Sequence, residues 1–520
     1  MTEKLENIFL EFYIDGTWVD YSDYIIDTIE YSYGISEPGV SSRISEVGIF
    51  KCLLRDLDIN LVGKNVRFSA KYLGNIHRKF TGKVYLQKRK VTTDKKSYLY
   101  LEIHDWIEEC ISKTFSSELL TNTNGEYVMQ FVLGDTRPEY YEFDQTAETY
   151  GAVFDLSSNT SKALSELSKV CNSDFGYLLL RHAGRNLLRF YNRNYKFTQV
   201  TKIPSEDGSY IVKDTNDSSI TQLVSEDGIP IIADDKFYTV NLIDEAAETE
   251  YSLGDQIYTG VNFSILPRKI DNTTVNLYTL NNPIELLPEE EKSGIIFRYT
   301  DPLQRAKNVA GTEMITPIGT TDYLFNTMED GSGVDITGYL QVSVQFFSTH
   351  AVVTLKNNAV TTGYVTSLRL RGKGVYSYDL ISKKIVNNDL SEKYSENILE
   401  FTAPYQNDVN KLTTLSTRLY DNYCNEPEEK LQSYKYIPNK NIFLMLIYIY
   451  IDVGDVVSIQ EDGKVDNYLI KYIKVKIEKD GIIFVEYKLD KVIDLSDPYT
   501  PWVLNDPEKS LLGINTYIGG

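Results

Sequence analysis

The sequence has few of the residues that build metal sites, redox centres and disulfide frameworks. Its 520 residues include four cysteines and four histidines, and no cysteine pair has the spacing of a zinc knuckle or a redox motif. The scatter of the cysteines indicates small core residues of a chain that folds in a reducing cytoplasm. They are Cys52, Cys110, Cys171 and Cys424.

Targeting segments, long apolar runs and positive charge are also scarce. The first residues lack the basic and apolar regions of a signal peptide, so we expect no secretion signal. The longest apolar run, residues 442–451, has about half of the ~20 residues that a membrane helix needs, and we expect a soluble chain. Lys and Arg number 53 against 74 Asp and Glu, and the net charge of −21 disfavours a nucleic-acid-binding protein.

Catalytic motifs are missing as well. There is no His-Glu-x-x-His, Gly-x-Ser-x-Gly, phosphate-loop or dinucleotide-binding motif. Gly372 and Gly374 lack the helix and the Lys-Ser/Thr of a phosphate loop, and they favour a tight turn. The loop from Asp330 to Asp335 lacks the spacing and the bidentate Glu of a calcium loop. Each histidine stands alone, which favours packing roles for His77, His104, His182 and His350. We therefore predict that the protein is not an enzyme and has no catalytic, cofactor-binding or metal-binding residues and no cofactor.

Two features of the sequence can be interpreted either as purely structural or as functional. The basic run Lys88-Arg89-Lys90, followed by Lys95-Lys96, fits a solvated strand edge protected by lysines. It also fits a salt-dependent dock for an acidic neighbour. The 40 tyrosines, against 21 Phe and 3 Trp, fit either protein interfaces or plain β-strand composition.

The clearest structural pattern is a long hairpin over residues 80–104. Leu99, Leu101 and Ile103 alternate with polar and aromatic residues, which is the period of a half-buried strand. Residues 80–90 form the partner strand, with a turn at 93–95. The hairpin and the residues before it hold about six strands in about 100 residues, a density typical of a β-barrel or sandwich.

Helical patterns begin after the hairpin. Asp105 is placed as the N-cap of a helix that starts at Trp106. A helix over about residues 160–172 and a hairpin over 177–191 make a small α+β module. Asp301-Pro302 predicts a short helix that reaches about residue 309. Three more strands are predicted at residues 339–347, 350–355 and 364–371.

The last structured part begins with a helix over about residues 407–423, in which Leu412, Leu415 and Leu419 form a core stripe. Residues 441–451 are too apolar for a half-exposed strand and predict a fully buried strand. Strands follow around residues 453–457, 473–477 and 483–489, and the chain ends in an extended segment.

Five motifs are spread over nearly the whole chain. They are Gly16-Thr-Trp-Val-Asp-Tyr-Ser; Arg43-Ile-Ser-Glu-Val-Gly-Ile-Phe-Lys-Cys-Leu-Leu; Phe80-Thr-Gly-Lys-Val, with the strand that ends at His104-Asp105-Trp106; Leu164-Ser-Glu-Leu-Ser-Lys-Val-Cys-Asn-Ser-Asp-Phe-Gly-Tyr; and Val453-Gly-Asp-Val-Val. In this order they resemble motifs of the baseplate hub, or tail-tip (minor tail), proteins of tailed bacteriophages. None of the motifs is catalytic.

This resemblance implies a structural protein of the virion tail tip that is made in the bacterial host cytoplasm. It implies a homotrimeric hub in which each copy supplies two tube-like β-barrels, so that the trimer adapts a sixfold tail tube to a threefold tip and lines the DNA channel. The implied partners are distal tail and tail-tube proteins, the tape measure protein, tip or fibre proteins, and genomic DNA that passes without specific binding. Many relatives carry a C-terminal fibre, lysozyme or peptidase domain, which we do not expect here, because the chain stops about 30 residues after its last predicted strand.

The predicted fold class is mainly β with α+β modules: tube-like β-barrels, a small α+β domain and a β-rich insertion. The predicted domains are an N-terminal barrel (1–111), an α+β module (112–232), a β-rich domain (233–400), a helix with strands that complete a second barrel (401–495) and an extended tail (496–520). Strands around 236–262 are candidates for the second barrel, because Ile257-Tyr-Thr-Gly-Val echoes Phe80-Thr-Gly-Lys-Val.

Two other classes of function stay open. Residues 233–400 could form a carbohydrate-binding module for a host-surface glycan, with exposed Tyr and Phe as stacking platforms. An enzyme, such as a depolymerase, would need a cleft with two carboxylates whose pKa values are pushed apart.

Overall fold

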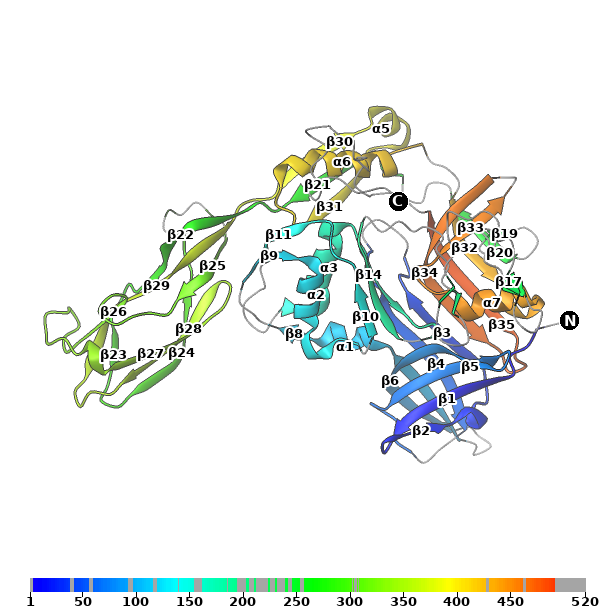
Figure 1. The fold of residues 1–520 in the computed structure, drawn as a ribbon, viewed down its shortest axis with the longest axis horizontal. Helices are drawn as coiled ribbons and strands as arrows, with labels where there is room; N and C mark the ends of the chain where they lie inside the picture. The colour runs from blue at the N-terminus through cyan, green and yellow to red at the C-terminus, as the bar shows by residue number, and fades with distance from the viewer. Residues whose placement is uncertain are drawn as a thin grey trace.

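The computed structural model is mainly β, as the sequence predicts, with short helices between the strands (Figure 1). It describes residues 3–37, 42–55, 59–91, 97–115, 119–138, 140–153, 161–184, 186–193, 203–204, 210–211, 223–224, 230–231, 239–241, 246–252, 257–301, 303, 306, 308–426, 430–461 and 464–491. The predicted tail, residues 496–520, lies outside the described residues. No helix in the described part of the chain is long and apolar enough to cross a membrane.

One sheet of 13 strands forms the body of the molecule (Figure 1). Its antiparallel path runs β2-β1-β5-β6-β7-β4-β3-β34-β35-β32-β20, with β33 paired to β34 and β19 to β33. The strands are β1 (Asn7–Ile14), β2 (Thr17–Asp20), β3 (Ile29–Gly34), β4 (Glu46–Arg55), β5 (Asn65–Tyr72), β6 (Asn75–Val91), β7 (Ser97–His104), β19 (Thr239–Asn241), β20 (Ala246–Ser252), β32 (Lys430–Tyr436), β33 (Val456–Glu461), β34 (Lys464–Ile477) and β35 (Ile483–Lys491).

N-terminal and C-terminal strands meet at one seam within this sheet. β3 pairs with β34 from Ile29 opposite Ile477 to Gly34 opposite Tyr472. One edge of β3 pairs with β4 and the other with β34, so β3 does not pair with β1 or β2. The described strands therefore form a curved, open sheet, and the closed barrels expected from the strand density are not found among them.

The predicted hairpin at residues 80–104 is confirmed as β6 and β7. Leu99, Leu101 and Ile103 are buried on one face of β7, as the alternation predicts. They pack in a core shared by both halves of the large sheet, together with Tyr31 of β3 and Tyr487 of β35. The predicted turn at residues 93–95 lies outside the described residues.

The apolar run at residues 441–451 is a helix, so the predicted strand there is wrong. The helix α7 spans Ile442–Tyr450, and the Asn441 side chain caps it by accepting a hydrogen bond from the Leu444 amide. The helix is buried against the large sheet on most of its surface, and an apolar run with no polar face carries no period that separates a buried helix from a buried strand.

The predicted helix-and-hairpin pattern is confirmed between the two halves of the sheet. Asp105 caps the first helix by accepting a hydrogen bond from the Ile107 amide. The elements are α1 (Trp106–Ser112), β8 (Thr114–Phe115), β9 (Leu120–Asn124), α2 (Gly125–Leu133), β10 (Tyr140–Phe143), β11 (Thr149–Val153), β12 (Ser161–Lys162), α3 (Ala163–Asp174), β13 (Tyr177–Arg181) and β14 (Leu187–Tyr191). Four short strands follow: β15 (Ile203–Pro204), β16 (Tyr210–Ile211), β17 (Leu223–Val224) and β18 (Pro230–Ile231).

A separate three-stranded sheet is covered by the confirmed helix α6 (Val409–Tyr423), whose Leu412, Leu415 and Leu419 are buried. Its strands are β21 (Gly260–Ile265), β30 (Ile381–Val386) and β31 (Ile398–Ala403), and α5 (Asn388–Tyr394) connects the last two. The motif at residues 257–261 thus leads into this small sheet. Of the strands expected around 236–262, β19 and β20 join the large sheet and β21 does not.

Residues 268–377 form an arm that projects from the body (Figure 1). Two sheets pack face to face around its core. The strands are β22 (Arg268–Thr279), β23 (Ile284–Leu286), β24 (Glu291–Arg298), β25 (Asn308–Ile315), β26 (Tyr323–Asn326), β27 (Leu340–Phe346), β28 (His350–Asn357) and β29 (Gly363–Ser377). The last three are the strands predicted there. Short 3-10 helices occur at Ser22–Tyr24, Gly134–Thr136, Thr337–Tyr339 and Pro438–Lys440.

Two predictions for the arm are wrong. β25 begins at Asn308, so the helix predicted to reach residue 309 does not extend that far, although Asp301 does accept a hydrogen bond from the Leu303 amide. Gly372 and Gly374 lie within β29 and not in a turn. A Cβ on Gly372 would lie 2.3 Å from the Met314 sulfur, so the missing side chain allows close packing inside the strand.

Candidate functional site: a buried polar junction

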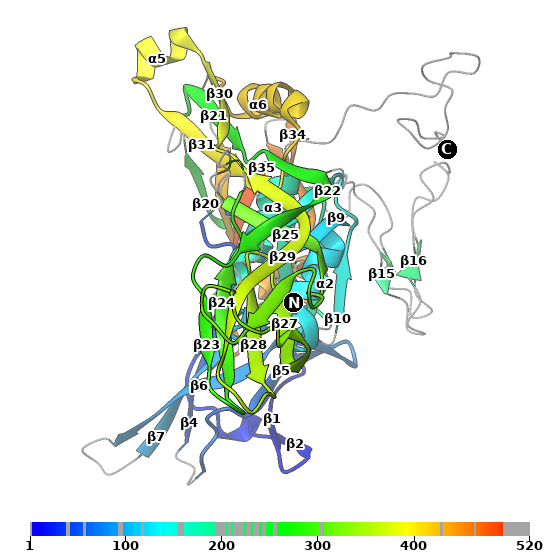
Figure 2. The same cartoon turned by 90° about the vertical axis from the view of Figure 1, so that its left-hand side faces the viewer.

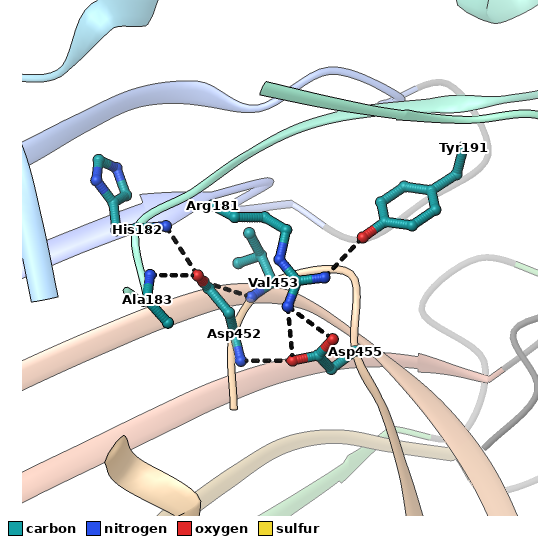
Figure 3. A network of polar contacts seen from close by, with 7 residues as sticks. All are labelled: Arg181, His182, Ala183, Tyr191, Asp452, Val453 and Asp455. Carbon is teal, nitrogen blue, oxygen red and sulfur yellow. Dashed lines mark hydrogen bonds and ion pairs between the residues drawn. The ribbon is translucent and has the colours of Figure 1, made fainter. Parts of the chain in front are cut away.

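A network of polar contacts lies where the β13–β14 hairpin meets the turn between α7 and β33 (Figure 3). The polar junction, as we name it, consists of Lys79, Asp105, Arg181, His182, Asp452 and Asp455. It connects three parts of the chain: the N-terminal strands, the helix-and-hairpin module and the C-terminal strands.

Asp452 is the centre of the junction, and its side chain is fully buried. Its carboxylate accepts hydrogen bonds from the amides of His182 at 2.8 Å, Ala183 at 2.6 Å and Val453 at 2.7 Å. Burial and then the Asp452 carboxylate raise the pKa of the neighbouring Tyr33 hydroxyl well above its usual value. A buried carboxylate is stable only where donors surround it, and here backbone amides supply them.

Arg181 and Asp455 form the second contact across the junction. One guanidinium nitrogen of Arg181 lies 2.8 Å and 3.0 Å from the two Asp455 oxygens, and another donates to the Tyr191 hydroxyl at 2.8 Å. Asp455 also accepts a hydrogen bond from the Asp452 amide. Gly454 has φ +85°, and a Cβ there would lie 2.8 Å from the Tyr191 hydroxyl, so the turn requires glycine.

His182 and Asp105 form a fully buried pair at 3.4 Å. The imidazole stacks on Phe80, with ring centroids 4.7 Å apart, and meets Tyr33 edge-on at 4.5 Å. Burial raises the pKa of Asp105, and His182 opposes that shift. Because Asp105 also caps α1, the pair fixes the start of that helix against the hairpin.

Lys79 reaches from β6 to the end of α7. Its ammonium group donates to the carbonyls of Tyr448 at 2.5 Å and Ile449 at 3.2 Å, which lie at the negative end of the helix dipole. Burial lowers the pKa of Lys79 to about 8. The lysine thus holds a C-terminal helix on an N-terminal strand.

These contacts form a structural connection between distant segments of the chain. The Asp452 oxygens are occupied by backbone donors, and the His182 ring is enclosed by aromatic side chains. Within the described ranges, no three His, Cys, Asp or Glu residues are arranged so that they could hold a metal ion. The junction orients three parts of the chain, with the carboxylates of Asp105 and Asp452 buried and that of Asp455 partly exposed.

The other residues singled out from the sequence lie apart from the junction. His104 bonds Glu102 and Glu108 and stacks on Tyr85 at the surface. His77 is half-buried, and burial lowers its pKa to about 4.

Candidate ligand and docking residues are also dispersed. His350 stacks on Phe347 in the arm. Asp330 and Asp335 accept hydrogen bonds from residues two positions later, so their oxygens serve local turns. Residues 88–90 are exposed on β6, while 95–96 lie outside the described residues.

Sequence reasoning missed Asp452, Asp455, Arg181 and Lys79 as a group. The one local signal was Val453-Gly-Asp-Val-Val, in which the glycine marks the turn and Asp455 follows it. The motif was assigned to strands, and its role in joining distant segments is not visible in sequence spacing.

No protein-family model and no curated protein matches the sequence. The chain is similar to the 43 kDa tail protein of prophage MuSo2 from Shewanella oneidensis, with 7% identity, TM-score 0.47 and coverage of 93% of this chain and 98% of that one. It is similar to a tail protein from Neisseria meningitidis MC58, with 8% identity, TM-score 0.44 and coverage of 93% of this chain and 96% of that one. It is also similar to the prophage tail protein gp18 from Listeria monocytogenes EGD-e, with 8% identity, TM-score 0.40 and coverage of 94% of this chain and 95% of that one. All three are described as tail proteins.

Proposed function

We propose that the protein is a structural component of a bacteriophage tail tip, a homotrimeric hub that adapts a sixfold tail tube to a threefold tip. The observation that carries the proposal is the seam between β3 and β34. It joins two β units edge to edge within one chain, so three copies would present six units in a ring.

Each unit contains one long hairpin. The N-terminal unit has β6–β7, the C-terminal unit has β34–β35, and the polar junction fixes the C-terminal turn to the hairpin that lies between the units. Of the motifs that resemble tail-tip proteins, the one that starts at Phe80 lies on β6, and the one that starts at Val453 lies in the junction turn and β33.

We further propose that the ring lines a channel for genomic DNA. A net charge of −21 repels the DNA phosphates, so DNA would pass without specific binding. The proposed partners are distal tail and tail-tube proteins, the tape measure protein and tip or fibre proteins, and the proposed location is the virion tail tip. The proposal assigns no enzymatic activity and no cofactor.

Light scattering on the purified full chain, followed by negative-stain imaging, tests the trimer. The expected result is a mass of three times 59.5 kDa and particles with a central opening. A folded protein that stays monomeric or dimeric at every concentration would overturn the proposal. A trimer whose channel wall is basic would overturn the DNA-channel part alone.

The glycan-binding alternative receives less support from the arm. Stacking on sugar rings requires exposed aromatic faces, and among the described arm residues Tyr339 is the aromatic side chain with high exposure. Tyr278 and Phe297 stack on one another against the core, with ring centroids 4.5 Å apart. A glycan array that detects specific binding by the full chain would favour this alternative.

A further inference from the structure

The far end of the arm exposes apolar side chains that no described residue covers. Three connections meet there, at residues 287–290, 327–339 and 358–362, because β23, β26 and β29 all end or begin at Gly363 and its neighbours. We call these residues the arm tip. Figure 1 shows the arm extending away from the body, and in Figure 2 the arm points toward the viewer, so the tip is separated from the large sheet.

Five apolar residues of the arm tip are between 54% and 89% exposed, with Val360 the most exposed. They are Leu287, Met328, Val334, Tyr339 and Val360. Single exposed apolar residues are ordinary on a protein surface, but five on adjoining connections at one end of a domain are typical of an interaction site.

The tip is held rigid by Asn357, which is fully buried. Its side-chain nitrogen donates to the carbonyls of Leu286, Leu287 and Thr361, and its oxygen accepts from the Ala359 amide at 2.8 Å. One side chain therefore fixes the backbone on which Leu287 and Val360 stand.

Asn326 does the same for the longest connection. Its side-chain nitrogen donates to the carbonyls of Gly331 and Gly333, and its oxygen accepts from the Met328 amide at 3.0 Å. The Val334 amide donates to the Thr327 hydroxyl at 2.9 Å. Apolar side chains on a fixed backbone lose little entropy on binding, which favours an interface.

The connections of the tip carry a net negative charge, although Glu290 forms an ion pair with Lys292 of β24 at 3.7 Å. The three connections contain five carboxylates and no lysine or arginine: Glu289, Glu290, Glu329, Asp330 and Asp335. A complementary surface is therefore apolar at its centre and basic at its rim.

We propose that the arm tip is a docking site for a protein that presents an apolar depression bordered by Lys or Arg. An anionic membrane or an anionic cell-wall polymer would be repelled by the carboxylates, and a second copy of the tip carries the same charge. A neutral glycan would need more aromatic surface than Tyr339 supplies. This inference does not depend on the trimeric ring.

Selection from a random peptide library on the immobilised full chain tests the proposal, with counter-selection on the double variant Leu287→Asp, Val360→Asp. We expect peptides that combine Lys or Arg with large apolar residues and that bind the double variant at least about tenfold more weakly in fluorescence anisotropy. Their affinity should fall as the ionic strength rises to about 0.5 M, where exposed charges are screened within roughly 4 Å.

Two further variants distinguish peptide binding at the arm tip from nonspecific hydrophobic binding and from the effects of misfolding. Ile76→Asp replaces an equally exposed apolar residue in the β5–β6 hairpin and should leave peptide binding unchanged. Glu329→Lys keeps the apolar tip and should weaken binding of the same peptides. The proposal is overturned if no selected peptide depends on the tip, if tip-dependent peptides lack basic residues, or if the tip variants instead abolish binding to phosphatidylcholine vesicles or to a glycan array.

Discussion

Asp452 and Ala183 are joined by a hydrogen bond of 2.6 Å, although 269 positions separate them in the chain. The contact fixes a C-terminal turn to the hairpin that packs beside the N-terminal strands. The Asp452 side chain is fully buried, and Ala183 is half-buried.

Asp452→Ala removes the acceptor of three backbone amides. The buried amide of His182 and the part-buried amide of Ala183 would lose their acceptor, and we expect a loss of about 2–4 kcal/mol in the free energy of unfolding. Urea denaturation followed by circular dichroism measures it. Asp480→Ala, in the exposed β34–β35 turn, is the control and should change stability by less than about 0.5 kcal/mol. Equal effects of the two substitutions would contradict the role of the junction.

Gly34→Ala tests the seam. A Cβ at this position would lie 2.2 Å from the Lys471 carbonyl oxygen, and φ is +106°. We expect a loss of more than about 2 kcal/mol and, if the seam sets the ring, loss of the trimer by light scattering. Gly16→Ala is matched, because Gly16 also has positive φ (+86°) but has open space around the added carbon. Gly16→Ala should lower the free energy of unfolding by only roughly 1 kcal/mol. If Gly34→Ala lowered it by no more than this, β3 and β34 would tolerate displacement.

Lys79→Met tests the contact between β6 and α7. The variant retains an apolar stem but leaves the Tyr448 and Ile449 carbonyls without their donor, and we expect a loss of about 1–3 kcal/mol. Lys83→Met, on the same strand, removes an exposed ion pair with Glu109 and should cost less than about 1 kcal/mol. Hydrogen exchange of the α7 amides is the specific measurement. Unchanged protection of α7 in Lys79→Met would be the contrary result.

The buried carboxyl group of Asp174 leads us to predict that the stability of the folded protein depends on pH. Burial raises the pKa of Asp174 to about 7, against the opposing effect of Arg193, although Asp174 accepts hydrogen bonds from the Ala147 and Arg193 amides. Because the folded state keeps the proton to higher pH than the unfolded state, the stability that Asp174 contributes is complete below about pH 4 and falls as the pH rises to about 7.

Asp174→Asn does not titrate, so the stability of the wild-type protein relative to this variant should fall by up to about 1.4 kcal/mol per pH unit across that window. Urea denaturation at several pH values measures the difference between the two proteins. A difference that stays constant from about pH 4 to about pH 8 would refute the assignment.

Local patterns predicted many of the elements well. The alternation of Leu99, Leu101 and Ile103 predicted β7, and the Asp105 cap predicted α1, because each signal depends on neighbours within a few residues. The run at 441–451 was misassigned because a wholly apolar segment has no polar face from which a period can be read.

The long-range features could not be read from the sequence. That Ile29 pairs with Ile477, or that Lys79 caps α7, follows from how the units pack, and no spacing within a motif encodes it. The junction was missed for the same reason. The predicted domain boundaries at residues 111, 232 and 400 stay predictions.

The seam between β3 and β34 also has a consequence for the order of events during synthesis. β3 leaves the ribosome early, while its partner around Ile477 follows only after most of the chain, which at roughly 5–20 residues per second is a delay of tens of seconds. Until then β3 has an open edge that strands of other nascent chains could occupy. A polypeptide cut short before residue 464 could not complete the sheet, so only finished chains would enter an assembly.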